Sequence, residues 1–147
     1  MAFSLSNFDV SHAPLVLSWV RSATQLAFWC SRTDHPLTDD TMFTRWHADP
    51  SVTPHLLFED GEVVAYGEVW RDDDEKEFEL ARLIVASEAR GRGVGQALVK
   101  HLLERLRGSA YEWVYVRVVP ENRVAIACYE GAWFSATWKR WYEARFQ

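Results

Sequence analysis

The stretch from Phe78 to Arg107 constrains the fold more than any other part of the chain. Phe78–Ala86 has the apolar pattern of a strand, and Arg90–Gly95 follows it as Arg-Gly-Arg-Gly-Val-Gly. The rest has the apolar period of an amphipathic helix, roughly 3.6 residues. Its stripe consists of Val94, Leu98 and Leu102, with Val99, Leu103 and Leu106 beside it. A strand that leads through such a turn into a helix indicates an α/β fold.

The glycines at 91, 93 and 95 leave the turn without side chains at alternate positions. Backbone N–H groups can then point into one concavity, and the start of the following helix adds unpaired N–H donors and the positive end of its dipole. Such a turn is typical of a phosphate or pyrophosphate site. The alternative is a tight turn whose glycines serve only packing.

Two common phosphate-binding motifs do not fit this turn. A P-loop requires Gly-Lys followed by Ser or Thr, and no such pair follows these glycines. The dinucleotide fingerprint G-x-G-x-x-G/A also fails, because its last position falls on Gln96 or Leu98. Both ligand classes are therefore disfavoured, although another phosphate ligand stays open.

The remaining chain alternates between helical and strand patterns without a repeat or a linker, so we expect a single domain over residues 1–147. Helices are expected from Ala13, over Ala23–Trp29, from Thr38 and over Arg123–Glu130, the last capped by Asn122. Strands are expected over Phe3–Phe8, His55–Phe58, Val63–Trp70, Glu112–Val119 and within Trp133–Phe146. This order predicts a mixed α/β fold with a partly antiparallel sheet.

Composition excludes several functional classes. The formal net charge of −5 argues against a nucleic-acid partner. The apolar stretch Ala13–Val20 is too short to span a membrane, and the N-terminus lacks the pattern of a signal peptide. Cys30 and Cys128 are expected to be reduced thiols in the cytoplasm, and no histidine or cysteine spacing indicates a metal.

Two motifs resemble those of the GNAT superfamily of acyl-CoA-dependent N-acyltransferases. Arg90-x-x-Gly93-x-Gly95 resembles the family's [Q/R]-x-x-G-x-[G/A] pyrophosphate loop. The segment Asn122-x-x-Ala125-x-x-x-Tyr129-x-x-x-Trp133-Phe134 is similar to its N-x-x-A-x-x-x-Y-x-x-x-G-F segment, with Trp133 in place of the usual glycine. The resemblance implies an N-acetyltransferase with a largely antiparallel mixed sheet, flanked by helices and containing a splayed parallel strand pair.

The same resemblance implies where acetyl-CoA binds. The diphosphate would lie on the loop, and the residues concerned are Arg90, Gly91, Arg92, Gly93, Val94 and Gly95. The pantetheine arm would pair with the backbone of Leu83, Ile84 and Val85, and the thioester would lie where the two parallel strands separate. Arg90 and Arg92 would add charge for the phosphates, and Asn122 and Tyr129 would lie beside the cofactor.

The family pattern also implies catalytic roles. Tyr129 matches the general acid that protonates the departing thiolate. Glu79, eleven residues before Arg90, is the first candidate for the base, Glu68 is the second, and ordered water is the alternative to both. Strand alternation predicts that Glu79, Ala81, Leu83 and Val85 share one face of their strand.

The acceptor is expected to be a primary amine of a small molecule or a peptide. Its site would be formed by the N-terminal helices, the hairpin and the C-terminal strands, with Trp29, His35, Trp46 and Trp70 as candidates. Similar proteins are commonly dimers, so a homodimer is compatible with the resemblance. The competing hypothesis is a module of this fold that binds acyl-CoA without catalysis.

Overall fold

The structure is a computed structural model, and it describes residues 2–36, 39–132, 135–136 and 141–145. Its strands are β1 (Phe3–Asn7), β2 (Val52–Glu59), β3 (Glu62–Asp72), β4 (Glu77–Val85), β5 (Trp113–Arg117), β6 (Ser135–Ala136) and β7 (Trp141–Arg145). Its helices are α1 (Ala13–Ser18), α2 (Ala23–Cys30), α3 (Met42–His47), α4 (Val94–Leu106) and α5 (Arg123–Gly131), with 3₁₀ turns at Val10–His12 and Ser87–Ala89. The predicted element order is confirmed.

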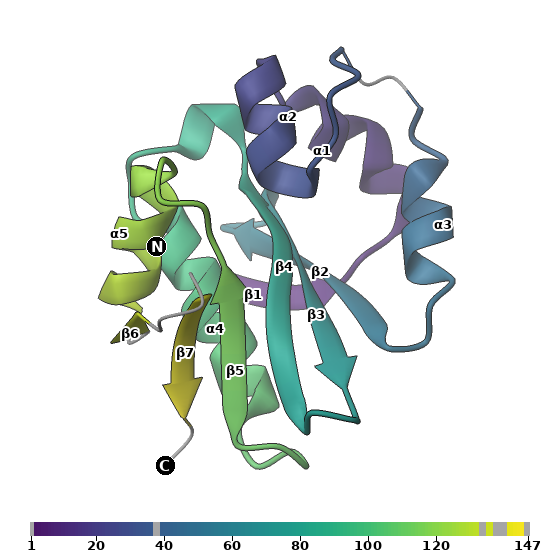
Figure 1. The fold of residues 1–147 in the computed structure, drawn as a ribbon. Coiled ribbons are helices and arrows are strands. Elements are labelled where there is room, and N and C mark those ends of the chain that lie inside the picture. The colour runs from purple at the N-terminus through teal and green to yellow at the C-terminus, as the bar shows by residue number, and fades with distance from the viewer. Residues whose placement is uncertain (1, 37–38, 133–134, 137–140, 146–147) are drawn as a thin grey trace.

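The strands form one sheet in the order β1-β2-β3-β4-β5-β7-β6 (Figure 1). Neighbouring strands are antiparallel except for β4 and β5, which are parallel. This topology confirms the predicted mixed, largely antiparallel sheet with a parallel pair in its middle.

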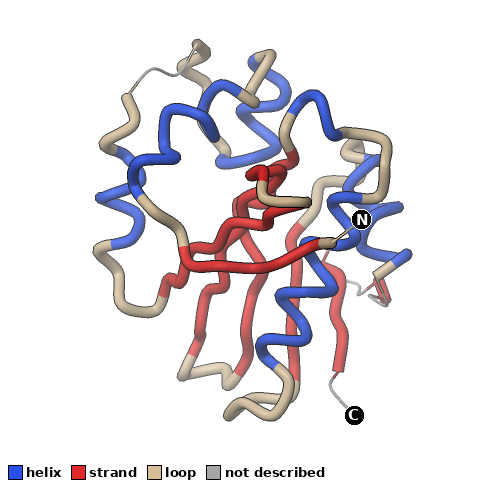
Figure 2. The backbone as a smooth tube through the Cα atoms, turned by 180° about the vertical axis from the view of Figure 1, so that it is seen from behind, coloured by secondary structure: helices blue, strands red, loops and turns tan. Residues whose placement is uncertain are grey.

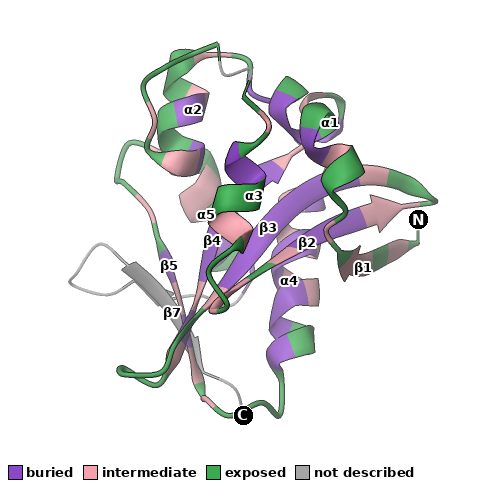
Figure 3. Cartoon of the chain, turned by 90° about the vertical axis from the view of Figure 1, so that its right-hand side faces the viewer, coloured by how far each residue is buried: buried purple, intermediate pink, exposed green. Residues whose placement is uncertain are grey.

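Helices cover both faces of the sheet. Helix α4 lies behind it in Figure 1 and is seen in front in Figure 2, while α2 and α3 lie over the opposite face. The predicted apolar stripe of α4 is confirmed, because its three residues and the three beside them are all buried. Figure 3 shows this buried side of α4 turned toward the buried surface of β3.

The third helix begins later than the sequence predicts. The sequence predicts a start at Thr38, which lies outside the described residues, whereas α3 starts at Met42. The side chain of Asp39 accepts a hydrogen bond of 3.0 Å from the backbone N–H of Thr41. Such a local bond closes a turn and competes with helix formation, which explains the later start.

Two further properties of the described residues concern the cysteines and the length of the helices. Cys30 and Cys128 are both free. Among the helices of the described residues, none combines the length and the apolar character needed to cross a membrane.

His55 of β2 gives the fold a pH-dependent stability. Its side chain is buried, and burial together with the positive charge of Arg105 lowers the pKa of His55 from 6.5 to about 4. The folded protein therefore keeps the ring neutral, while the unfolded chain takes up a proton below pH 6.5. We expect the free energy of unfolding to fall, by on the order of 3 kcal/mol from this residue, as the pH drops from neutral to 4.

Urea unfolding of the wild type and of His55→Leu across this pH range measures the effect. The difference between their unfolding free energies should shrink or reverse as the pH falls. If that difference stays constant with pH, the pH dependence of the unfolding free energy does not come from His55.

Candidate active site

The loop between β4 and α4 leaves backbone donors open. Gly91 and Gly93 adopt left-handed φ angles of 79° and 78°, a region that glycine tolerates best. A Cβ built on either glycine would meet no atom within 4 Å, so the space above both is open. Gly93 is the N-cap of α4, whose first N–H groups have no partner within the helix. The loop can therefore bind an anionic group through its backbone.

The third loop glycine serves packing. A Cβ on Gly95 would lie 3.2 Å from the Cys128 sulfur, so α4 and α5 approach each other closely at this point. This contact places the start of α4 beside α5.

Both arginines of the loop bind protein groups. The Arg90 guanidinium donates to the carbonyl oxygens of Val85, at 3.1 Å, and Trp19, at 2.6 Å. The Arg92 guanidinium pairs with the Glu59 carboxylate at 3.0 Å. These bonds join the loop to β4, to Trp19 directly after α1, and to β2. With both guanidinium groups bound to protein groups, the backbone N–H groups are the loop's other donors for an anion.

The parallel pair β4–β5 separates directly before the loop. Its register runs from Glu77 opposite Trp113 to Leu80 opposite Val116, and β4 then continues to Val85 beyond that pairing. On its other side β4 carries a bulge against β3 at Arg82, which has a left-handed φ of 51°. The backbone of residues 83–85 therefore faces the gap beside β5.

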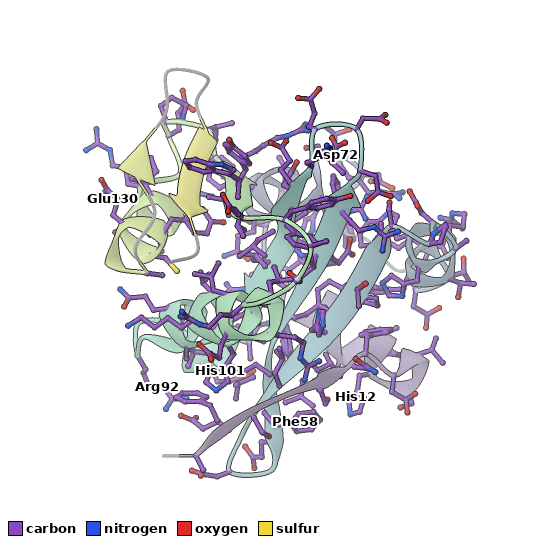
Figure 4. The ribbon with its side chains drawn as sticks, turned by 90° about the horizontal axis from the view of Figure 1, so that it is seen from below. His12, Phe58, Asp72, Arg92, His101 and Glu130 are labelled. Atoms are coloured by element: carbon purple, nitrogen blue, oxygen red, sulfur yellow. The ribbon has the colours of Figure 1, made fainter. Side chains whose placement is uncertain are left out.

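A cavity of about 680 Å³ lies at the other end of β4, between β3, β5 and α3. The described lining carries more carboxylates than cations. The carboxylates are Asp49, Asp72, Asp73, Asp74, Glu77 and Glu79. The arginines are Arg45, Arg71, Arg82 and Arg117. Figure 4 shows Asp72, at the edge of this cavity, far from Arg92 of the loop.

Glu79 lines this cavity and directly precedes Leu80, the last residue of β4 that pairs with β5. Its side chain is only 12% exposed, and its carboxylate accepts from the Arg117 guanidinium at 3.2 Å. Burial raises the pKa of Glu79 above its ordinary value, although the charge of Arg117 opposes the rise. A carboxylate with a raised pKa at the edge of a cavity is suited to accept a proton.

Glu68 is enclosed by donors. Its side chain is fully buried. Its carboxylate accepts from the hydroxyl of Tyr66, from Trp70 Nε1 at 2.8 Å and from Arg82 at 2.8 Å. Burial alone would raise the pKa of Glu68, but these donors and the nearby His47 ring outweigh it and lower the pKa. This geometry argues against Glu68 as a base that contacts the substrate.

Tyr129 lies on α5, beside the start of α4. Asn122 caps that helix, because its side-chain oxygen accepts from the Ala125 N–H at 3.3 Å, as predicted. The Tyr129 side chain is buried, and burial raises the pKa of its hydroxyl. The phenol therefore stays protonated at neutral pH, which is the form that a general acid requires.

The family model of the acetyltransferase (GNAT) family matches residues 20–132. The chain belongs to the GNAT acetyltransferase family. The resemblance drawn from the loop and from the Asn122–Phe134 segment is thereby confirmed. Trp133 and Phe134, the last two residues of that segment, lie outside the described residues. No curated protein matches the chain in sequence.

Solved GNAT structures share the fold. Aminoglycoside acetyltransferase AAC(6')-Ib in complex with coenzyme A and kanamycin is 20% identical with a TM-score of 0.78, covering 98% of this chain and 95% of that chain. Spermidine N-acetyltransferase from Vibrio cholerae in complex with CoA and spermine is 15% identical with a TM-score of 0.75, covering 92% and 82%. The GNAT domain of S. lividans PAT is 19% identical with a TM-score of 0.78, covering 97% and 89%. At these identities the likeness establishes the fold.

GNAT acetyltransferases use acetyl-CoA, and the residues present fit it. The open space above Gly91 and Gly93 can take the diphosphate on the loop N–H groups. The gap beside residues 83–85 can take an extended arm along a strand edge. No group of three or more metal-ligating side chains that could hold an ion occurs among the described residues.

The predicted acceptor residues of this GNAT protein divide into two groups. Trp46 and Trp70 line the cavity. Trp29 is buried outside the cavity lining and donates from Nε1 to the Arg82 carbonyl at 2.8 Å. His35 is exposed in the segment between α2 and α3, and the cavity lining does not include it.

The prediction that Glu79, Leu83 and Val85 share a face is wrong. Glu79 lines the cavity, whereas a Cβ on Gly67 would meet the side chains of Leu83 and of Leu98 on α4. A Cβ on Gly95 of α4 would likewise contact Val85. The bulge at Arg82 adds a residue to β4 and reverses the alternation beyond it.

Proposed function

We propose that the protein is an N-acetyltransferase that moves the acetyl group of acetyl-CoA to a primary amine. The observation that carries this proposal is the arrangement along β4. Glu79 lines an acidic cavity at its start, the gap opens after Leu80, and the open glycine loop follows its end. One strand therefore links an acceptor site, a place for the thioester and a phosphate site.

In this proposal the loop N–H groups hold the diphosphate and the backbone of residues 83–85 holds the arm. Bound acetyl-CoA supplies the acetyl group as a thioester. Glu79 takes a proton from the attacking amine as the nitrogen–carbon bond forms. Tyr129 gives its proton to the sulfur as the carbon–sulfur bond breaks, so the thiol leaves neutral.

The charge of the cavity supports a cationic acceptor. Each arginine of its described lining already has a carboxylate partner, and the pairs are Arg45–Asp39, Arg71–Asp73, Arg82–Glu68 and Arg117–Glu79. Asp49, Asp72 and Asp74 add further negative charge. An amine with more than one ammonium group suits such a lining.

Release of free CoA thiol from acetyl-CoA, measured with a panel of amines, tests the proposed function. The panel contains amino acids, aminoglycosides, polyamines and peptides with free N-termini. Thiol release that depends on the amine, with the acetylated amine identified by mass spectrometry, supports the proposal. Tight CoA binding without transfer to any amine would instead favour a non-catalytic acyl-CoA-binding module.

Glu79→Gln is expected to lower kcat/KM for the amine by about 100-fold at neutral pH, because a general base contributes on this order. Burial raises the pKa of Glu79, so the wild-type rate should fall as the pH drops through that raised pKa and the carboxylate gains a proton. The variant should lack this acidic limb of the pH–rate profile.

Glu77→Gln is the matched control, since Glu77 lines the same cavity from the same strand. It should raise KM for a cationic amine and keep the acidic limb. If Glu79→Gln retains that limb, another group or water is the base.

A further inference from the structure

Arg82 occupies a backbone conformation that needs support. Its φ of 51° lies in the left-handed region, which is unfavourable for a residue with a Cβ. It forms the bulge of β4, because Tyr66 pairs with Ile84 while Glu68 pairs with Ala81. Such outliers persist where the surroundings hold them, and they concentrate at functional sites.

Neighbouring side chains bind both the guanidinium group and the backbone carbonyl of Arg82. Its guanidinium stacks over the rings of Trp46, at 3.9 Å, and Trp70, at 4.9 Å. The same group donates to the Glu68 carboxylate at 2.8 Å. Its carbonyl accepts from Trp29 Nε1 at 2.8 Å. Side chains from α2, α3 and β3 therefore fix one residue of β4.

Glu68 is itself fixed. It is fully buried on β3, and it accepts from the Tyr66 hydroxyl and from Trp70 Nε1. The Tyr66 hydroxyl lies 2.8 Å from Nε2 of His47 on α3. The ion pair of Glu68 with Arg82, whose side chain is 20% exposed, is partly buried. Such a pair is weak evidence for stability, because moving charges out of water is costly. The pair therefore calls for a reason beyond the stability of the fold.

That reason is the backbone that follows the bulge. The bulge turns Leu83 and Val85 toward α4, just where β4 continues beyond its pairing with β5. We propose that Glu68 and Arg82 are positioning residues, which set the backbone of residues 83–85 for the pantetheine arm of CoA without touching the reacting atoms. This inference rests on the proposed function, since it requires CoA to bind along β4.

Arg82→Gly tests the inference, because glycine accepts the left-handed backbone but removes the clamped side chain. Two ligands are titrated by calorimetry: CoA, and adenosine 3′-phosphate 5′-diphosphate, which lacks the pantetheine arm. The variant should bind CoA about tenfold more weakly, the equivalent of one or two lost hydrogen bonds. Its affinity for the nucleotide alone should not change, because the nucleotide requires only the loop.

Lys76→Gly is the matched control. Lys76 also has a left-handed φ, of 56°, but it lies in the exposed turn between β3 and β4. This variant should bind both ligands like the wild type. Arg82→Lys keeps the charge opposite Glu68 but loses the planar group that stacks on the tryptophans, so its CoA affinity should lie between those of Arg82→Gly and the wild type.

Glu68→Gln provides a second variant if Arg82→Gly does not fold, and it should show the same loss confined to CoA. Equal loss of both ligands, or undiminished CoA affinity in the folded variants, would overturn the inference. Wild-type protein that binds neither ligand would overturn the proposed function itself, which is a distinct result.

Discussion

Gly93→Glu is expected to weaken CoA binding by at least about 100-fold, or nearly 3 kcal/mol. The backbone at Gly93 has a φ of 78°, and a Cβ there would point into open space. The glutamate would therefore fit sterically, but its carboxylate would occupy the place of the diphosphate at the start of α4 and repel it. Calorimetric titration with CoA measures the loss.

Gly108→Glu separates this effect from backbone strain. Gly108 follows the other end of α4, has the same φ of 78°, and likewise faces open space. Both substitutions should cost about 1 kcal/mol of stability from the left-handed backbone. Only Gly93→Glu should lose CoA. If the two variants bind CoA with equal affinity, the diphosphate does not bind at the glycine loop.

The sequence was sufficient where local rules decide the structure. The period of Val94, Leu98 and Leu102 predicted the buried side of α4. The side chain of Asn122 predicted the start of α5. The alternating glycines predicted the open loop, because their conformational freedom is a local property. These features need no knowledge of distant residues.

The bulge at Arg82 could not be predicted in this way. Strand alternation assumes a regular strand, and a single added residue reverses every position after it. The one local signal was Gly67, a glycine inside the neighbouring strand, because such glycines often mark bulges or close approaches. Gly67 lies opposite the bulge because of how β3 pairs with β4, and the sequence alone does not give that pairing.

Local sequence patterns also could not predict which groups the charged residues bind. Alternation on β3 does place Tyr66, Glu68 and Trp70 on one face, so part of the buried network was within reach. Arg82 and His47 join it from other elements. Similarly, Arg90 was expected at the phosphates, and its bond to Trp19 joins segments that are distant in sequence.

Tyr129→Phe is expected to lower kcat by about 100- to 1,000-fold, within the range of general acid catalysis. The substitution keeps the buried ring and removes only the hydroxyl, whose pKa burial raises. Without that proton the thiol must leave as a thiolate. The affinity for CoA, which depends on the loop and on β4, should change by less than about threefold. Steady-state rates and calorimetry give the two values.

The split between kcat and CoA affinity distinguishes an acid from a packing residue. If the tyrosine only packs against the sheet, its substitution should lower the free energy of unfolding by about 1 kcal/mol and leave kcat of the folded protein unchanged. Tyr111→Phe is the matched control, since it removes a phenol that donates to Asp73 in a turn, and kcat should stay the same. If Tyr129→Phe also keeps the wild-type rate at several pH values, the proton must reach the sulfur from another group or from water.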